Sequence, residues 1–348
     1  MAELWFWIVS LMLAIYAVLD GFDLGCGALH LVVARSNSER RQVLGAIGPL
    51  WDGNEVWLLA AGGALFLAFP KVLAAGFSGL YLALFLVLWA LLLRGISLEF
   101  RSHLQDSLWR IFWDAVFAFA SALLPILLGT ALGNVVRGVP LDASGAFSLP
   151  LFTSFRPRSP LGILDWYTVL MGLFVLATLM AHGALFLIWK TEGSVQARSR
   201  RLAGPLWLAV LGLGLAATWA TARVAPDLFR RLPLAPMAWV CLALCLAGLA
   251  AVLLGLLRDR PLSAFLGSGV WIAGLLATTA ACAFPVLLRS TLDPFWSLTT
   301  LNAASDAHGL RTGILGWLAG FALAVTYVAF IFRLHGGKVP VAPEGEGY

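Results

Sequence analysis

Nine apolar runs, each long enough to cross a lipid bilayer, constrain this chain more than any other feature of its sequence. A bilayer core of about 30 Å needs about 20 helical residues. Hydrophobic residues make up 61% of the 348 residues and charged residues only 12%, against about 25% charged in a soluble domain. The runs cover residues 4–33, 45–69, 72–94, 109–134, 162–189, 203–223, 237–257, 262–288 and 309–333. We predict an all-α, polytopic membrane protein with about nine transmembrane helices.

Successive connections between the runs lie on alternate sides of the membrane, and Lys and Arg residues are unevenly divided between these two sides. One side holds 14 of the 23 basic residues, in and beside 34–44, 95–108, 190–202, 258–261 and the tail from Arg333. Cytoplasmic loops of membrane proteins carry this excess. The bias predicts the N-terminus outside and the C-terminus in the cytoplasm. The net charge of +5 then reflects membrane orientation and does not indicate nucleic-acid binding.

The runs also suggest how the chain is divided. We predict a single integral membrane domain over 1–336, with a first bundle over about 1–134 and a second half over about 162–333. The second and eighth runs both end in Ala-Phe-Pro, which suggests two four-helix bundles plus one peripheral helix. Four prolines in 135–161 predict an irregular loop there. Residues 337–348 are predicted to be a flexible tail.

Acidic residues inside the first two runs are the strongest functional signal. Asp20 and Asp23 are three residues apart in the first run, and Asp52 and Glu55 are three apart in the second. Residues at this spacing share a helix face. Ionisable side chains at membrane depth are costly, so they usually face a protein interior or a water-filled path. We expect both pairs to point into a packed bundle, in the cytoplasmic half of the membrane.

Other residues near these acids allow two interpretations. Arg94 and Asp114 lie near the inner ends of the third and fourth runs. The charged residues form either a buried ion-pair network that fixes helix packing or an access path for protons. Gly62 and Gly63 are small enough to predict close approach of a neighbouring helix.

Ligands for a metal or haem are sparse in the predicted spans. A haem between two helices needs strong axial ligands such as His or Met facing each other, and only His30 and His182 lie in or near the spans. The four cysteines lie in apolar runs and are interpreted as packing residues. We predict no metal site in this chain and no complete catalytic centre of its own.

Several stretches resemble subunit II of the cytochrome bd-type quinol oxidases, the smaller integral partner of the haem-bearing subunit I. The first 115 residues match most specifically. The matching stretches are Asp20-Gly-Phe-Asp23-Leu-Gly25, Trp51-Asp52-Gly53-Asn54-Glu55-Val56-Trp57-Leu58, Gly62-Gly63-Ala64-Leu65-Phe66, Phe77-Ser78-Gly79, Arg94-Gly-Ile-Ser-Leu-Glu-Phe-Arg101, Trp109-Arg110, Trp113-Asp114 and Ala283-Phe284-Pro285.

The resemblance implies a heterodimeric terminal oxidase of the bacterial inner membrane, which oxidises quinol and reduces dioxygen to water. Such an enzyme works in the aerobic respiratory chain and generates a proton motive force without pumping. The haems, haem b and haem d or a b-type replacement, would be ligated by subunit I. A small single-span accessory subunit, membrane lipid and quinone are the other partners that it suggests.

The resemblance also assigns roles to single residues. Asp52 matches the carboxylate of the proton path, and Trp57 matches the aromatic residue at the lipid-side mouth of the oxygen path. The two lie roughly 140° apart around the helix, which suits one polar and one apolar conduit. The other proton-path residues are Glu55, Asp20 and Asp23. Ion-pair support is assigned to Arg94, Arg101 and Asp114.

Two alternatives stay open. A secondary transporter would also have midplane carboxylates and helices interrupted by glycine, although the acids here cluster in one half of the chain. A purely structural scaffold subunit would have all its intramembrane charges paired. The Asp52→Asn substitution separates a relay role from a packing role.

Overall fold

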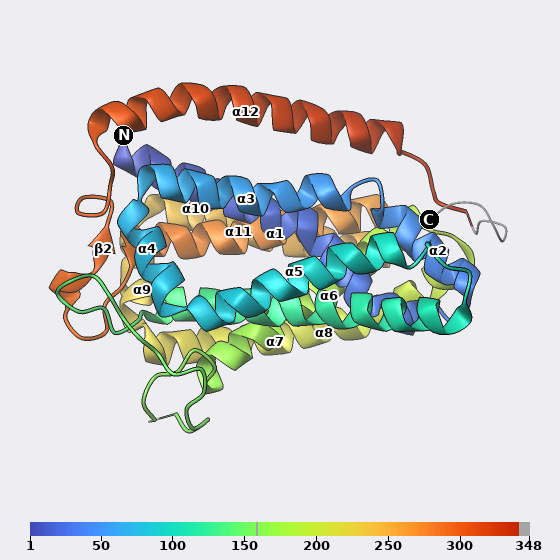
Figure 1. Cartoon of the computed structure of the whole chain (residues 1–348), viewed down its shortest axis with the longest axis horizontal. Coiled ribbons are helices and arrows are strands. Elements are labelled where there is room, and N and C mark those ends of the chain that lie inside the picture. The colour runs from blue at the N-terminus through green and yellow to red at the C-terminus, as the bar shows by residue number, and fades with distance from the viewer. Residues whose placement is uncertain (158, 341–348) are drawn as a thin grey trace.

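The computed structural model describes residues 1–157 and 159–340, and these form a bundle of long helices that lie side by side (Figure 1). Two short strands, β1 (Val286–Leu288) and β2 (Leu298–Thr299), pair antiparallel between the last two long helices. The helices are α1 (Ala2–Val33), α2 (Asn37–Ile47), α3 (Trp51–Ala68), α4 (Pro70–Gly79), α5 (Tyr81–Phe100), α6 (Ser107–Arg137), α7 (Trp166–Lys190), α8 (Gly193–Val224), α9 (Pro226–Arg231), α10 (Pro236–Leu257), α11 (Pro261–Ala283) and α12 (Ala307–Leu334), with 3-10 turns η1 (Leu232–Leu234) and η2 (Pro294–Trp296).

The number of spans agrees with the sequence. Among the described residues eight helices are long and apolar enough to cross a membrane, and α3 with α4 makes a ninth as one span bent by 119°. The prediction of an all-α polytopic membrane protein is confirmed. Segment 139–161 is free of helix wherever the structure describes it, as its prolines predicted.

Two predicted boundaries are wrong. Helix α2 occupies most of 34–44, which the sequence indicated as a loop, because Ser36 and Glu39 form a capping box that starts a helix. The third crossing begins at Tyr81 and not at residue 72, because Pro70 starts the separate helix α4 after the bend.

The two ends of the bundle differ in character. We call one the basic end: it is formed by the turns between α1 and α2, α5 and α6, α7 and α8, and α10 and α11, with residues 335–340. We call the other the loop end: it carries Met1 and the connecting segments 138–165 and 284–306. The N-terminus and the end of α12 lie at opposite ends (Figure 1), as an odd number of spans requires.

Helix α1 is the centre of the bundle and α12 is peripheral. Helix α1 packs against α3, α6, α7 and α11, and its backbone touches α7, since a Cβ on Gly25 would lie 1.9 Å from the Leu179 carbonyl oxygen. Helix α12 lies along the outside next to α3 (Figure 1). Because α1 packs against helices of both halves, the division into two four-helix bundles stays a prediction.

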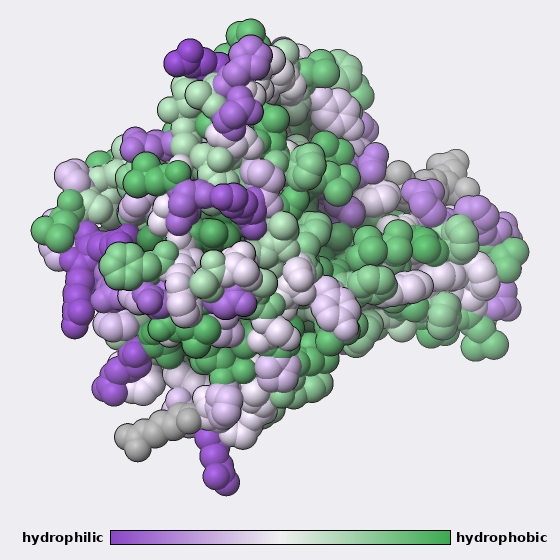
Figure 2. All heavy atoms as spheres, turned by 60° about the vertical axis from the view of Figure 1, so that its left-hand side comes forward, coloured by the Kyte–Doolittle hydropathy of each residue, from purple (hydrophilic) through white to green (hydrophobic). Residues whose placement is uncertain are grey.

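On the face that Figure 2 shows, hydrophobic side chains cover much of the side of the bundle, and hydrophilic ones gather towards its ends. Such a band suits a bilayer, whose apolar core lies between two polar surfaces.

Part of the predicted flexible tail is held in place. The Val339 amide donates to the Lys190 carbonyl at 2.7 Å, and Gln42 Nε2 donates to the Val339 carbonyl at 2.8 Å. The remainder of the predicted tail, 341–348, lies outside the described residues.

Candidate functional site

The first cluster is built around Arg94 of α5, whose side chain has no exposed surface. Its Nη2 lies 2.8 Å from Asp20 Oδ1 and 4.0 Å from Asp23 Oδ2, both on α1. Its Nη1 lies 3.5 Å from Glu55 Oε2 on α3. Asn54, one residue earlier on α3, donates from Nδ2 to Asp23 Oδ2 at 2.7 Å. Helices α1, α3 and α5 therefore meet at one guanidinium.

The first cluster contains more acidic than basic groups. One guanidinium faces three carboxyl groups, and buried ionised groups must be paired or lose their charge. The cluster therefore holds more carboxyl groups than its one cation can pair. Glu55 is its one member with substantial access, at 22% of its side chain.

Asp52 does not join this cluster, and the expectation that it points into a packed interior is wrong. Its side chain is exposed near the basic end of α3. Next to it, Gly53 packs under the ring of Tyr327 from α12, where a Cβ would lie 2.6 Å from Cε1. The rotation of α3 thus turns Glu55 towards Arg94 and leaves Asp52 on the outer face.

The second cluster lies at the basic end and centres on Asp114 of α6. Arg101 donates from Nε to Asp114 Oδ1 at 2.6 Å, and Arg40 from Nη1 to Oδ2 at 3.0 Å. His30 Nε2 lies 2.8 Å from Oδ1. Two guanidinium groups thus compensate a single carboxylate. The structure brings Arg101 and Asp114 together, as predicted for ion-pair support, but apart from Arg94. The participation of His30 and Arg40 was not predicted.

Trp57 lies buried under α12, and its ring packs edge-on against Phe321 at 5.8 Å between centroids. Both side chains line an apolar groove of about 800 Å³ between α1, α3 and α12. Gly63 also lines the groove. The expectation of a helix packed closely on Gly62 and Gly63 is wrong, because nothing lies within 4 Å of a Cβ built at either position.

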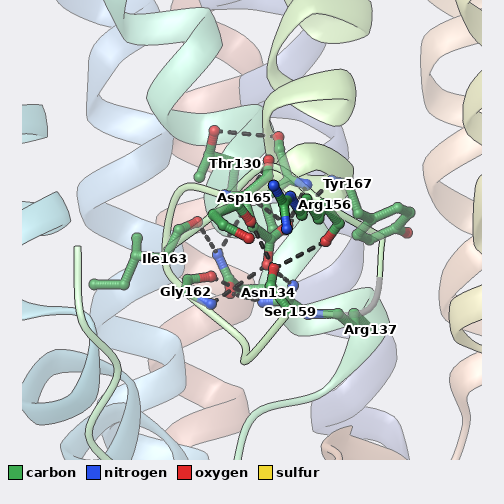
Figure 3. Close-up of polar contacts among 11 residues, drawn as sticks. Thr130, Asn134, Arg137, Arg156, Ser159, Gly162, Ile163, Asp165 and Tyr167 are labelled. Carbon is green, nitrogen blue, oxygen red and sulfur yellow. Dashed lines mark hydrogen bonds and ion pairs between the residues drawn. The ribbon is translucent and has the colours of Figure 1, made fainter. Parts of the chain in front are cut away.

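A third polar network, which the sequence analysis missed, fastens the loop end (Figure 3). Arg137 Nη1 at the end of α6 pairs with Asp165 Oδ2, and its Nη2 donates to Asn134 Oδ1 at 2.6 Å. Asp165 also caps α7 in a capping box with Thr168. Asp-x-x-Thr before an apolar run was the sequence signal that could have revealed it. This network ties the start of α7 to the end of α6.

The two intramembrane histidines are engaged within the protein, His182 at both ring nitrogens and His30 at one. His182 has both ring nitrogens engaged, with Ser268 Oγ at 2.6 Å and the Val18 carbonyl at 3.1 Å. His30 uses Nε2 for Asp114, and its ring packs edge-on against Phe117. Within the described residues, no cluster of three His, Cys, Asp or Glu side chains could hold a metal ion.

This architecture defines a class: an all-α, multi-pass membrane protein in which a buried ion cluster is shared by three helices. The family model for "Cytochrome bd terminal oxidase subunit II" matches residues 1–335. The chain belongs to that family, and the resemblance seen in the sequence is confirmed.

Individual relatives agree with this family assignment. The chain is 30% identical over 342 residues to cytochrome bd-I ubiquinol oxidase subunit 2 of Escherichia coli K12, covering 91% of this chain and 88% of that one. It is 32% identical over 319 residues to cytochrome bd ubiquinol oxidase subunit 2 of Bacillus subtilis, covering 89% and 88%. A chain in a solved bd oxidase structure from Geobacillus thermodenitrificans shares the fold, with a TM-score of 0.76 over 96% and 98% of the chains at 18% identity. The spans and the family together indicate a multi-pass protein of the bacterial inner membrane.

Proposed function

We propose that this chain is the non-haem-ligating integral subunit of a bd-type terminal oxidase, which oxidises quinol and reduces dioxygen to water. The observation that carries the proposal is the family match over residues 1–335. As in the relatives named above, the chain would work beside a second integral subunit, subunit I. Membrane lipid, quinone and a small single-span accessory subunit complete the partners that we propose.

The haems, b and d or a b-type replacement, would be held by subunit I. The donor set of this chain supports that division, since His182 is bonded at both nitrogens and His30 is packed between Asp114 and Phe117. The contribution of this chain is then to stabilise subunit I and to supply the routes by which protons and dioxygen arrive.

The basic end would face the cytoplasm, because cytoplasmic connections carry the excess of Lys and Arg. Protons would then arrive from that end, pass the exposed Asp52 and the half-buried Glu55, and reach the cluster of Asp20, Asp23 and Arg94. The charge imbalance of that cluster supports this role, because one guanidinium cannot balance three carboxylates.

The face of α3 that carries Asp52 would be covered by subunit I in the assembled enzyme. An acidic side chain exposed within a membrane span is costly unless protein or water covers it. Helix α12, which buries Leu310 alone among its described residues, borders the same face. Covering this face would place Asp52 at the subunit boundary.

Dioxygen would reach the enzyme through the apolar groove that Trp57 lines. Dioxygen is apolar and partitions into the bilayer core, and the groove lies between apolar side chains of α1, α3 and α12. Asp52 lies at the outer surface, whereas Trp57 is buried beneath α12. The polar and apolar routes are thereby kept apart.

Purification of the tagged chain from its native membrane tests the proposal. We expect a second integral protein to co-purify, with b-type haem bands, or b-type and d-type bands, in the optical redox spectrum. Quinol-dependent oxygen consumption should accompany them. A folded chain that purifies alone, without haem, would overturn the proposal and favour the transporter.

A further inference from the structure

The face of α1 towards α5 and α6 carries a continuous polar stripe. Tyr16, Asp20, Asp23, Gly27 and His30 follow one another at alternating spacings of four and three residues, which keeps them on one helix face. All five are buried. The stripe therefore runs inside the protein from the Arg94 cluster to the Asp114 cluster.

Ser121 of α6 lies between the two clusters. A Cβ built on Gly27 would come 2.1 Å from Ser121 Oγ, so this hydroxyl rests directly on the α1 backbone. Along α1, Gly27 is about 6 Å from Asp23 and about 4.5 Å from His30. Gly27 is required at this point because any side chain would occupy the place of the Ser121 hydroxyl.

Buried polar atoms without a protein partner lie along the seam where the polar stripe of α1 meets α5 and α6. They are Arg40 Nε, His30 Nδ1, Ser121 Oγ, Asp23 Oδ1 and Arg94 Nε. Buried polar groups are almost always hydrogen-bonded, and water serves them where protein does not. One water bridges polar groups about 5 to 6 Å apart, and the rise along α1 between neighbouring stripe positions, about 4.5 to 6 Å, is of the same size.

We propose that the seam between α1, α5 and α6 is a hydrated proton path from the basic end to the Arg94 cluster, with His30 and Ser121 as its relay and positioning residues. This path is distinct from the route past Asp52 on the outer face of α3. It rests on the proposed function, because it delivers protons to the same cluster.

The relay step at His30 conserves protons. His30 Nε2–H stays on the Asp114 carboxylate, which the guanidinium groups of Arg40 and Arg101 keep ionised. A proton from water binds Nδ1 and forms a short-lived imidazolium, which Asp114 stabilises and the guanidinium groups of Arg40 and Arg101 destabilise. Nδ1 then gives the proton to the next water towards Ser121, and the ring returns to neutral. The Ser121 hydroxyl positions that water and accepts and donates one hydrogen bond.

Ser121→Ala in the assembled, haem-loaded enzyme is the sharpest test. Ser121 Oγ makes no protein hydrogen bond, so its removal should leave folding intact, because no protein group loses a hydrogen-bond partner. We expect unchanged haem content and melting temperature, quinol oxidase turnover lower by roughly tenfold, and a larger solvent deuterium isotope effect. Ser121→Thr keeps the hydroxyl and should retain turnover.

Two further variants make the test specific. Ser199 of α8 also has a buried hydroxyl without a partner, and Ser199→Ala should behave as wild type. Gly27→Ala, which places a methyl group against Ser121 Oγ, should reproduce the loss. Wild-type turnover and isotope effect in Ser121→Ala would overturn the path while leaving the oxidase function intact. A wild-type chain without haem partner or quinol oxidation would instead overturn the proposed function.

Discussion

Arg94 Nη2 lies 2.8 Å from Asp20 Oδ1, and neither side chain has any exposed surface. The same guanidinium also faces Asp23 and Glu55. A single cation thus joins α5 to two other helices and offsets the burial of their acids. Breaking such a pair on one side leaves buried charge without compensation, which costs more than the pair contributes when intact.

Arg94→Ala should therefore prevent assembly or destabilise the complex by about 3 to 5 kcal/mol. Arg94→Lys keeps the charge but loses the planar fork that reaches two carboxylates. The stability of this variant should lie between those of wild type and Arg94→Ala. Thermal unfolding of the purified complex and its yield from membranes measure the effect. An Ala variant that melts as wild type would exclude Arg94 from this role.

Asp52→Asn tests the role of Asp52 in proton conduction separately from any role in protein stability. Asp52 is exposed on this chain, so the amide variant should change the free energy of unfolding of the chain itself by no more than about 0.5 kcal/mol. Quinol-driven turnover should fall by roughly tenfold or more if the carboxylate passes protons. Glu99→Gln alters another exposed acid near the basic end of α5 and is the matched control. Normal turnover in Asp52→Asn would remove Asp52 from the proton path.

Gly63→Leu should narrow the groove without disturbing the helix. Nothing lies within 4 Å of a Cβ at Gly63, and leucine has a higher helix propensity than glycine by about 1 kcal/mol. We expect a higher KM for dioxygen at unchanged melting temperature. Gly204→Leu on α8, which also meets nothing within 4 Å, should leave the KM unchanged. An equal KM in both variants would argue against oxygen passage through the groove.

Glu39 should make stability depend on pH in the acid range. Hydrogen bonds from Arg198, and then from Ser194, hold the pKa of Glu39 below its usual value. Its stabilising effect is full above the unfolded pKa of about 4.3 and is lost as pH falls through the lower folded value. The difference in melting temperature between wild type and Glu39→Gln should be constant near neutrality and shrink below about pH 4. A difference that stays constant down to about pH 2 would contradict this role of Glu39.

Asp165→Asn should loosen the loop end. Asp165 pairs with buried Arg137 and caps α7. The substitution should therefore lower the free energy of unfolding by about 3 to 5 kcal/mol and make 138–164 accessible to protease. Limited proteolysis from the loop side, followed by mass spectrometry, measures this. Asp142→Asn changes an acid that is exposed on the same segment and should leave cleavage slow. Equal cleavage of the two variants would contradict the role of the Arg137 pair.

Much of the fold could be predicted because membrane burial leaves few choices. Apolar runs of about 20 residues must form helices, since no water in the bilayer core can satisfy exposed backbone groups. The same cost predicts that most intramembrane charges find partners, and Asp20, Asp23 and Arg94 do so. The sequence by itself thus determined the spans, the family resemblance and the acids worth attention.

The tertiary structure alone decided which helix faces meet. Asp52 and Glu55 share a face, yet the packing of Tyr327 on Gly53 accompanies a rotation of α3 that exposes one and turns the other towards Arg94. His30 and Asp114, 84 residues apart, meet only because α1 and α6 pack side by side. Helix rotation and partner choice depend on shape complementarity between distant segments, which periodicity within one segment does not encode.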